Sequence, residues 1–322
     1  MARALSHPLR LAYAVLFVSL ALSAAGRAQT LRFGVAGALS PTATPWVSLR
    51  VENARVGSDR VTLGLSYDGA AQLVLGMQAN ESFGPVGNVV GEGTLTVRTD
   101  GAAQGTLGLR GVLGPVALGA QLAGFTDAPA RFDPLAVAGD ARPDLASGGW
   151  GVSFDASGRP ARTWIVQANP QVYVLPGGTA WRADARVRWL RAIGPHELSL
   201  RLRGYLPPGA AGDAAVGVGF TYHRRRAPDL DGALYLGVGA GGFAPGLTAS
   251  LAQALGPVQA SLALHAEPYR RDVPPYRARL DLSFDVGNGT AAVAGAAAHG
   301  PDGTSGAVAV RYALPVHLPP AP

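Results

Sequence analysis

The chain has 322 residues, with 44 glycines, 25 prolines and no cysteine, and only 15% of its residues are charged. The lack of cysteine excludes a disulfide-stabilised scaffold and thiolate metal sites, and a hydrophobic content of 48% argues against intrinsic disorder. The abundance of glycine disfavours a helical enzyme, because glycine costs about 1 kcal/mol in a helix interior.

The first 28 residues predict an export signal. Arg3 and Arg10 precede an apolar run over residues 11–22, and small residues follow up to Ala28, where we expect cleavage. The run is too short for a membrane-spanning helix. Cleavage would remove three arginines and no acid, which lowers the formal net charge from +6 to +3. This modest charge gives no support for nucleic-acid binding, and residues 29–322 are expected to form a single domain.

Alternation of apolar and polar residues with a period of two dominates the mature chain. Leu198, Leu200 and Leu202, for example, alternate with polar residues. Successive side chains of a strand point to opposite faces, so each such segment has one apolar and one polar face. The pattern predicts 18 strands, at residues 31–39, 46–56, 60–67, 71–81, 88–98, 104–113, 116–125, 148–156, 161–174, 179–192, 196–206, 214–223, 230–240, 245–255, 258–267, 276–286, 290–298 and 305–314.

The connections are rich in residues that favour turns. If every connection is a hairpin, four glycine-proline turns lie at one end of the sheet, together with both ends of the chain. The longest connection, 126–147, then lies at the other end. The four turns are Gly84-Pro85, Gly114-Pro115, Gly194-Pro195 and Gly256-Pro257.

Two architectures fit this alternation. A soluble sandwich would bury the apolar faces, whereas a membrane barrel would turn them to lipid. Segments of about ten residues match a tilted membrane crossing, and the polar faces carry few charges. Trp181 and Trp189 share one face, as expected for two interfacial girdles. Further aromatic residues stand at predicted strand ends, namely Trp46, Tyr67, Phe125, Trp150, Trp164, Tyr205, Tyr222, Tyr276 and Tyr312.

Over residues 31–314 the chain resembles bacterial outer-membrane β-barrel proteins of the porin-like class. The resemblance rests on the alternation, the aromatic positions and the hairpin connections. It implies an all-β, transmembrane, antiparallel up-and-down barrel of about 18 strands, with 14–18 plausible and both termini periplasmic. It also implies contact with outer-membrane lipid and with the outer-membrane assembly machinery, for which Tyr312 is the candidate terminal aromatic residue.

The polar faces collect charged residues that would line the lumen. Around the turn at Gly194-Pro195, five arginines face two carboxylates, and arginine in a pore favours anions. The alternative is a cross-strand ion-pair ladder that only braces the wall. The candidate pore-lining residues are Arg182, Asp184, Arg186, Arg188, Glu197, Arg201, Arg203, Arg279, Asp281 and Arg311.

Other segments carry weaker indications. The connection 126–147, with Asp127, Asp133, Asp140 and Asp144, is interpreted as a solvated loop. Residues 223–226 together with Asp229 and Asp231 are interpreted as a charged turn. Ser261, His265 and Glu267 form only a weak triad-like set, and no metal or cofactor site is predicted. Small residues on the polar faces favour an open lumen; these are Gly217, Gly219, Gly237, Gly239 and Ala296.

The sequence therefore predicts a non-enzymatic outer-membrane pore for small solutes or ions, with an arginine-rich lumen and a mild anion preference. Two alternatives stay open. One is a structural or adhesive envelope barrel with a closed lumen, and the other is a secreted, soluble β-sandwich binding module.

Overall fold

The computed structural model describes residues 30–40, 44–56, 58–83, 87–138, 148–193, 196–222, 228–239 and 241–315. Several predictions of the sequence fall outside these residues. They are the export signal, the turns Gly84-Pro85 and Gly194-Pro195, residues 223–226, and Asp140 and Asp144.

The described residues contain 18 strands, the number that the alternation predicts. They are β1 (Thr30–Ser40), β2 (Thr44–Val56), β3 (Asp59–Tyr67), β4 (Ala71–Phe83), β5 (Gly87–Arg98), β6 (Ala103–Leu113), β7 (Val116–Phe125), β8 (Gly149–Ala161), β9 (Trp164–Leu175), β10 (Gly178–Ile193), β11 (His196–Leu206), β12 (Asp213–Tyr222), β13 (Asp229–Gly239), β14 (Gly242–Leu255), β15 (Val258–Ala266), β16 (Tyr276–Val286), β17 (Gly289–Gly300) and β18 (Gly303–Pro315).

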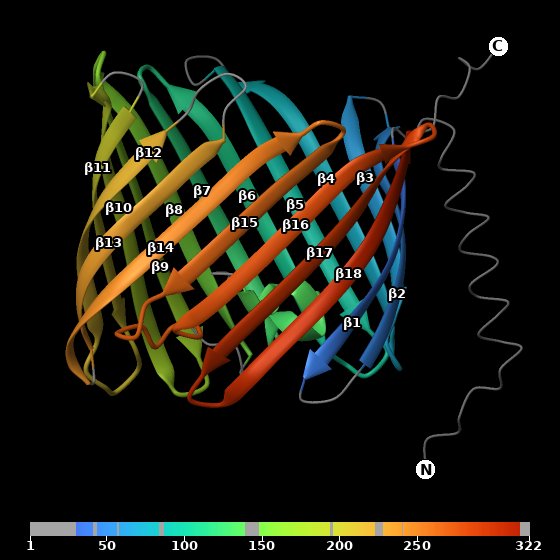
Figure 1. The fold of residues 1–322 in the computed structure, drawn as a ribbon. Coiled ribbons are helices and arrows are strands. Elements are labelled where there is room, and N and C mark those ends of the chain that lie inside the picture. Colours follow the sequence, from blue (N-terminus) through green and yellow to red (C-terminus); the bar gives the residue numbers. More distant parts are fainter. Residues whose placement is uncertain are drawn as a thin grey trace, which may run out of the picture.

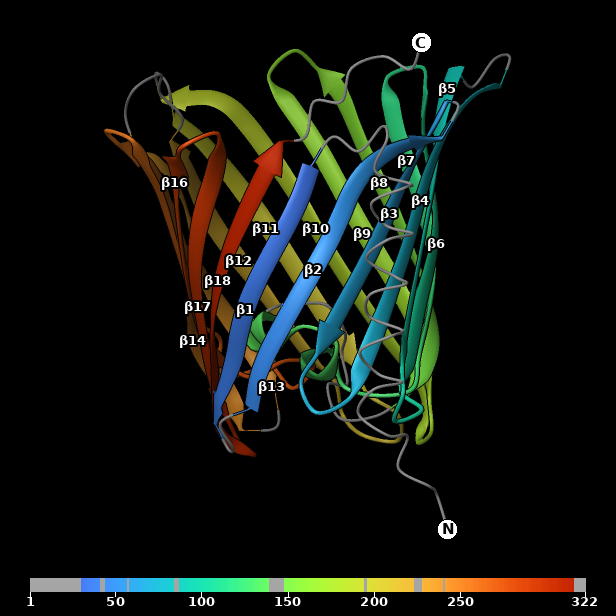
Figure 2. The same ribbon diagram turned by 90° about the vertical axis from the view of Figure 1, so that its right-hand side faces the viewer.

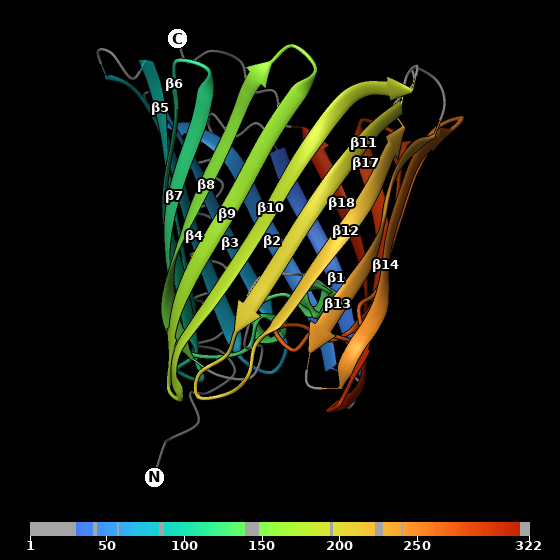
Figure 3. The same cartoon turned by 90° about the vertical axis from the view of Figure 1, so that its left-hand side faces the viewer.

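The strands close into one antiparallel barrel, seen from three sides in Figures 1, 2 and 3. Each strand pairs with its neighbours in the chain, and β1 pairs with both β2 and β18, which joins the two ends of the sheet. Closure leaves no strand edge unpaired. The prediction of a closed, antiparallel, up-and-down barrel is confirmed, and the soluble sandwich is wrong.

One hairpin differs from its predicted bounds. Gly158 and Pro160 resemble turn residues in the sequence, yet β8 continues through them to Ala161, and the turn is formed by Arg162 and Thr163. The register between β8 and β9 shifts between Gly158 and Ala161. The glycine and the proline therefore belong to an irregularity in the strand, one of the places where strands tolerate such residues.

The outer surface of the barrel is apolar. Along β12 the inward side chains are covered, whereas Val216, Val218 and Phe220 are exposed on the outside. Leu107 and Leu234 are 66% and 69% exposed. Large apolar side chains in such positions require lipid rather than water as their surroundings, and the fold is that of a transmembrane barrel.

The aromatic residues divide between the two faces. Trp181 and Trp189 are 55% and 42% exposed on the exterior, so their predicted common face is confirmed. Trp46, Phe125 and Tyr205 are instead buried inside the barrel, so their assignment to the girdles is wrong. Position at a strand end does not determine which way a side chain points. The side chain faces outward when an even number of positions along the strand separates it from a residue that is exposed on the exterior.

The glycine-proline turns confirm the predicted arrangement where they are described. Gly114 and Gly256 have φ angles of 57° and 62°, which glycine adopts without steric cost, and proline follows each of them. These turns lie at the end of the barrel where β1 begins and β18 ends. We call it the terminal end, and the opposite end the loop end.

Two short 3-10 helices, η3 (Pro129–Arg131) and η4 (Pro134–Ala138), lie in the connection between β7 and β8. Figures 1 and 2 show them inside the barrel near the loop end. In the part of the chain that the structure describes, no helix is long and apolar enough to cross a membrane.

Adjacent residues of β7 test the assignment of the two faces. Leu122 is exposed on the exterior, and its neighbour Gln121 lines the lumen. We expect Leu122→Arg to impair assembly, because an arginine on the lipid face costs about 2–4 kcal/mol near the midplane, and Gln121→Arg to assemble normally. The faster migration of unboiled folded barrel in gel electrophoresis reports assembly. Equal assembly of the two variants would contradict the assignment.

Candidate functional site

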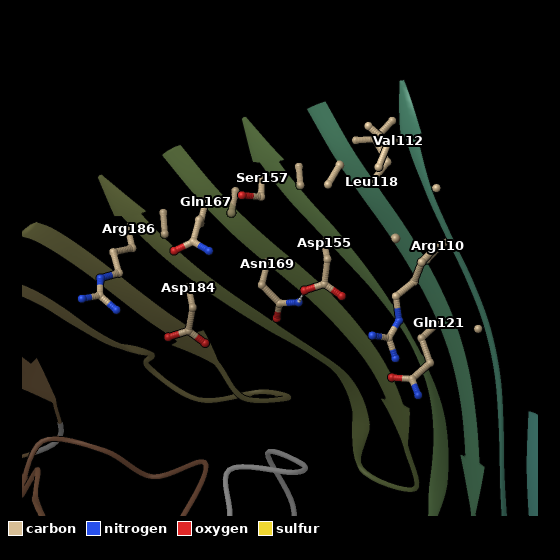
Figure 4. Close-up of a pocket in the computed structure, with 18 of the residues that line it drawn as sticks. Arg110, Val112, Leu118, Gln121, Asp155, Ser157, Gln167, Asn169, Asp184 and Arg186 are labelled. Carbon is tan, nitrogen blue, oxygen red and sulfur yellow. Dashed lines mark hydrogen bonds between the residues drawn. The ribbon is translucent and has the colours of Figure 1, made fainter. Parts of the chain in front are cut away.

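Two neighbouring strands gather seven of the predicted site residues on one part of the lumen wall. The antiparallel register sets Asp184 opposite Arg203 and Arg186 opposite Arg201. Figure 4 shows Asp184 and Arg186 directed into the lumen cavity. We name this set the arginine wall; it consists of Arg182, Asp184, Arg186 and Arg188 from β10 and Glu197, Arg201 and Arg203 from β11.

The two carboxylates of the arginine wall bind three of its arginines. Arg188 Nη2 lies 2.5 Å from Glu197 Oε2. Asp184 lies between two arginines, 3.1 Å from Arg182 Nε and 3.4 Å from Arg203 Nε. This part of the wall matches the ion-pair ladder that the sequence left open as an alternative.

A third carboxylate, from β13, neutralises part of the remaining positive charge. Asp231 Oδ1 lies 2.8 Å from Nη2 of both Arg186 and Arg201, and it accepts a hydrogen bond of 2.5 Å from Thr221. The interpretation of Asp231 as part of a charged turn is wrong, and so is the balance of five arginines against two carboxylates. The alternation along the predicted strand 230–240 places Asp231 on the polar face, so the sequence contains the signal that Asp231 lines the lumen.

The connection between β15 and β16, residues 267–275, folds into the lumen and is anchored by Glu267. This carboxylate is fully buried and binds Arg203 of the arginine wall. It also lies 2.9 Å from Arg277 Nη2 and 3.2 Å from Arg270 Nη1. One buried acid thus joins β11, β16 and the connection itself.

A second acid of the same connection adds another attachment to the arginine wall. Asp272 Oδ2 lies 2.5 Å from Arg270 Nη2 and 3.4 Å from Arg182 Nη1. The backbone N–H of Arg271 donates a hydrogen bond of 3.0 Å to Asp213 at the start of β12. Residues 267–275 are therefore held against β10, β11 and β12 as well as against their own hairpin.

Small residues of β13 and β14 receive this connection. A Cβ atom added at Gly237 would lie 2.2 Å from the ring of Tyr269, and one at Gly246 would lie 2.6 Å from it. A Cβ at Gly239 would lie 2.4 Å from the Tyr269 carbonyl oxygen. The glycines do not leave this part of the lumen open, as the sequence suggested, but provide the surface on which the tyrosine packs.

The connection between β7 and β8 packs against the opposite wall. Leu135 of η4 is 1% exposed and lies among Ala294 and Ala296 of β17 and Ala307 and Ala309 of β18. The expectation of a solvated loop is wrong for its described part. The alanines of β17 and β18 made this contact possible, because their short side chains leave room for an inserted leucine.

Polar contacts hold the same connection at the loop end. Arg98 Nη1 donates a hydrogen bond of 2.8 Å to the Arg131 carbonyl oxygen. Arg98 Nη2 lies 3.1 Å from Asp100 Oδ2, and Arg131 Nη2 lies 2.7 Å from the same oxygen. Gln72 donates a hydrogen bond of 3.1 Å to the Phe132 carbonyl oxygen.

The remaining predicted site residues lie away from the arginine wall. Arg279 and Asp281 form an ion pair of 2.8 Å on β16. Arg311 of β18 lies 3.7 Å from Asp133, beside the inserted η4. These three residues belong to the polar face of the barrel, but they are close to the inserted connection rather than to the seven clustered residues.

The lumen keeps a cavity of about 850 Å³ against the wall formed by β5 to β11. Figure 4 shows Arg110, Gln121, Asp155 and Asn169 on β6 to β9, the strands that continue the wall from β10. The cavity therefore presents mainly guanidinium groups from β10 and β11, and mainly amides and carboxylates from β7 to β9.

The triad-like set does not form a catalytic arrangement. Glu267 Oε2 lies 3.7 Å from His265 Nδ1, but the carboxylate is occupied by three arginines. Ser261 lies opposite Asp281 in the register of β15 and β16. Among the described residues, no group of three or more histidines and acids could hold a metal ion.

No family model matches the sequence, and neither does any curated protein. Solved structures with a similar course of the chain include a triple mutant of the porin of Rhodopseudomonas blastica, with 14% identity and a TM-score of 0.44, covering 88% of this chain and 98% of that chain. Another is described as a bacterial polysaccharide outer membrane secretin, with 8% identity and a TM-score of 0.47, covering 91% of this chain and 99% of that chain.

The carboxylates that hold the two connections are strongly acidic. Hydrogen bonding from Arg98 is the main reason why the pKa of Asp100 is lowered to about 2. Burial disfavours the charged form of Glu267, but the contact with His265 and the three surrounding arginines outweigh it and hold its pKa well below the usual range. Both groups have a lower pKa in the folded than in the unfolded protein, so their stabilising effect is complete above the unfolded value.

The lowered pKa values of Asp100 and Glu267 predict how the protein responds to acid. We expect the attachments made by Asp100 and Glu267 to hold at about pH 4, the ordinary pKa of a carboxyl group, and to be lost as the pH falls towards about 2, the pKa of Asp100. Conductance of the assembled barrel at constant salt, corrected for that of the buffer and compared between about pH 4 and about pH 2, checks the prediction. A conductance unchanged over this range would contradict it.

Proposed function

We propose that the protein is a passive pore for small solutes or ions in a bacterial outer membrane, with a mild preference for anions. The observation that carries the proposal is the lumen cavity of about 850 Å³, which stays beside the inserted connections and is lined by charged and amide side chains. The exposed apolar exterior supports a place in a membrane.

The charges around the cavity support the anion preference. The five arginines of the arginine wall, together with Arg270 and Arg277, contact five carboxylates, so seven arginines against five acids leave an excess of two positive charges; the acids are Asp184, Glu197, Asp231, Glu267 and Asp272. A ring or patch of arginine in a pore favours anions. The excess is smaller than the sequence suggested, which is why the expected preference is mild.

Export and assembly complete the proposal. The mature protein would begin after Ala28 and insert with the terminal end facing the periplasm. The outer-membrane assembly machinery would recognise the final strand, in which Tyr312 is the candidate aromatic residue. Determining the mass of the protein in isolated outer membranes tests the cleavage site, and protease treatment of intact cells tests the orientation.

Reconstitution into a planar bilayer tests the pore. We expect stepwise ionic conductance and, in a salt gradient, a reversal potential that favours the anion. The gel-mobility assay establishes that the reconstituted protein is an assembled barrel. A complete lack of conductance from assembled barrel would overturn the proposal.

A structural envelope barrel with a closed lumen is the second candidate. The two connections that fold into the lumen from the loop end favour it, because they occupy space that a wide barrel would otherwise leave open. The same bilayer experiment distinguishes the two functions, since the structural barrel would assemble without conducting.

A further inference from the structure

Two tryptophans stack on the exterior of the barrel near the terminal end. Trp164 begins β9 and lies directly opposite Trp189 of β10 in the register. Their ring centroids are 5.7 Å apart and the rings are inclined by only 7°. Both stay 40% or more exposed, so the stacked pair presents a rigid aromatic surface at the level where lipid meets water.

Three exposed arginines adjoin this pair along the chain. Arg159 lies near the end of β8, Arg162 lies in the turn that leads to Trp164, and Arg191 follows Trp189 by two residues. Arg159 Nε donates a hydrogen bond of 3.1 Å to the Arg162 carbonyl oxygen. This hydrogen bond holds Arg159 against the turn that carries Arg162, and Arg191 stands near the end of β10, the strand that pairs with β9.

The contacts between the strand ends keep this section together. The backbone N–H of Leu190 donates a hydrogen bond of 2.7 Å to the Thr163 carbonyl oxygen, which joins the end of β10 to the turn between β8 and β9. Figure 3 shows these three strands side by side at the terminal end. The arginines therefore stand on a connected part of the barrel rather than on separate loops.

Within the described ranges of the chain, no carboxylate pairs with these arginines. Asp155 of β8, Asp184 of β10 and Glu197 of the neighbouring β11 belong to the lumen side. Asp155 accepts a hydrogen bond from Asn169, and Glu197 binds Arg188. The section of rim thus carries an uncompensated positive charge beside an aromatic surface.

The backbone of Arg191 has a conformation that is uncommon for arginine. Its φ angle is 56°, in the left-handed region that favours glycine, and it lies where the register of β10 and β11 shifts. The other non-glycine residue described with a positive φ is Asn53, a type that tolerates this conformation. Strained residues of this kind are concentrated where ligands bind.

We propose that this patch, made of Trp164, Trp189, Arg159, Arg162 and Arg191, binds the phosphate of an anionic phospholipid from the adjoining leaflet. Guanidinium groups match the geometry of phosphate oxygens, and tryptophan combines an apolar ring with an N–H donor at the membrane interface. The lipid's chains would lie along the apolar exterior of β9 and β10. The inference requires that the barrel is embedded in a membrane, and it does not require that the lumen conducts ions.

Native mass spectrometry of the mature, detergent-purified barrel tests the proposal. The protein is titrated with dioleoyl phosphatidylglycerol and, separately, with dioleoyl phosphatidylcholine. We expect the anionic lipid to be retained at concentrations about tenfold lower, since each arginine near a membrane surface adds to the attraction of anionic lipid. Equal retention of the two lipids would overturn the proposal.

Variants then locate the site. The triple variant Arg159→Gln, Arg162→Gln, Arg191→Gly should lose the preference, and its gel mobility should remain that of an assembled barrel, because glycine suits the φ angle at position 191. The matched control compares two double variants. The first is Arg159→Gln, Arg162→Gln, and the second is Arg55→Gln, Arg60→Gln. The second pair removes two exposed arginines from the hairpin between β2 and β3, at the same rim but without a tryptophan pair.

The control separates a site from a general charge effect. We expect the first pair to weaken retention of phosphatidylglycerol and the second pair to leave it unchanged. An equal loss in both pairs would show that only the net charge of the rim matters, and would overturn the proposal. Millimolar inorganic phosphate should leave the lipid bound; its displacement would identify a site for free phosphate instead.

Discussion

Replacing Glu267 with alanine is expected to release residues 267–275 from the lumen wall and to raise the single-channel conductance. The carboxylate is fully buried and binds Arg203, Arg270 and Arg277. Removing it leaves three covered guanidinium groups without their shared partner. Breaking a buried ion pair in this way costs about 3–5 kcal/mol, enough to favour a conformation in which the arginines reach water.

Two variants control this experiment. Glu267→Gln keeps the size of the side chain and one acceptor oxygen, so its conductance should lie between those of the parent and of Glu267→Ala. Glu197→Ala removes a carboxylate of the arginine wall itself, one that binds Arg188 rather than a residue of the connection. We expect it to leave the blocking effect of residues 267–275 intact. Parent-like conductance of assembled Glu267→Ala would show that the connection does not restrict the pore.

The strands could be predicted from the sequence because alternation is a local property. The segments 116–125, 196–206 and 276–286 coincide with β7, β11 and β16. In each of them a run of alternating residues is bounded by glycine, proline or charged turn residues, and each strand needs only its two faces to be distinguished. Closure then follows, because eighteen hairpin-linked strands with an apolar outer face leave no stable place for a free edge.

The filling of the lumen could not be predicted in the same way. Gly237 and Ala296 are small whether they border open water or receive an inserted residue, and only the three-dimensional path of Tyr269 and Leu135 decides between these cases. A connection that folds inward is attached by contacts with strands distant in the chain. The pairing of Glu267 with Arg203, for example, joins residues 64 positions apart, and no local pattern records it.

The charge balance of the arginine wall was only partly predictable. Asp184 and Glu197 share strands with the arginines, so the alternation alone predicts them among the lumen residues. Asp231 comes from another hairpin, and it reaches Arg186 on β10 and Arg201 on β11 across β12. Selectivity depends on such contributions from neighbouring strands, so it has to be tested on the complete cluster.

Replacing Asp231 with asparagine is expected to strengthen the anion preference of the pore. The change removes one negative charge and leaves Arg186 and Arg201, both 2.8 Å from the carboxylate, without their acidic partner. An ion passing within about 8 Å, the Debye length at physiological salt, experiences this charge. We expect the ratio of chloride to potassium permeability to rise about twofold, and reversal potentials in a potassium chloride gradient measure it.

Variants of the same cluster separate charge from shape. The double variant Arg186→Gln, Arg201→Gln leaves Asp231 unpaired and should shift the preference towards cations. Arg201→Gln combined with Asp231→Asn keeps the net charge of the parent and should keep its selectivity, although both side chains have changed. The expected order of anion preference is therefore Asp231→Asn first, then the parent and the charge-neutral variant together, then the arginine double variant. Identical reversal potentials in all four conducting barrels would mean that these arginines brace the wall and do not select ions.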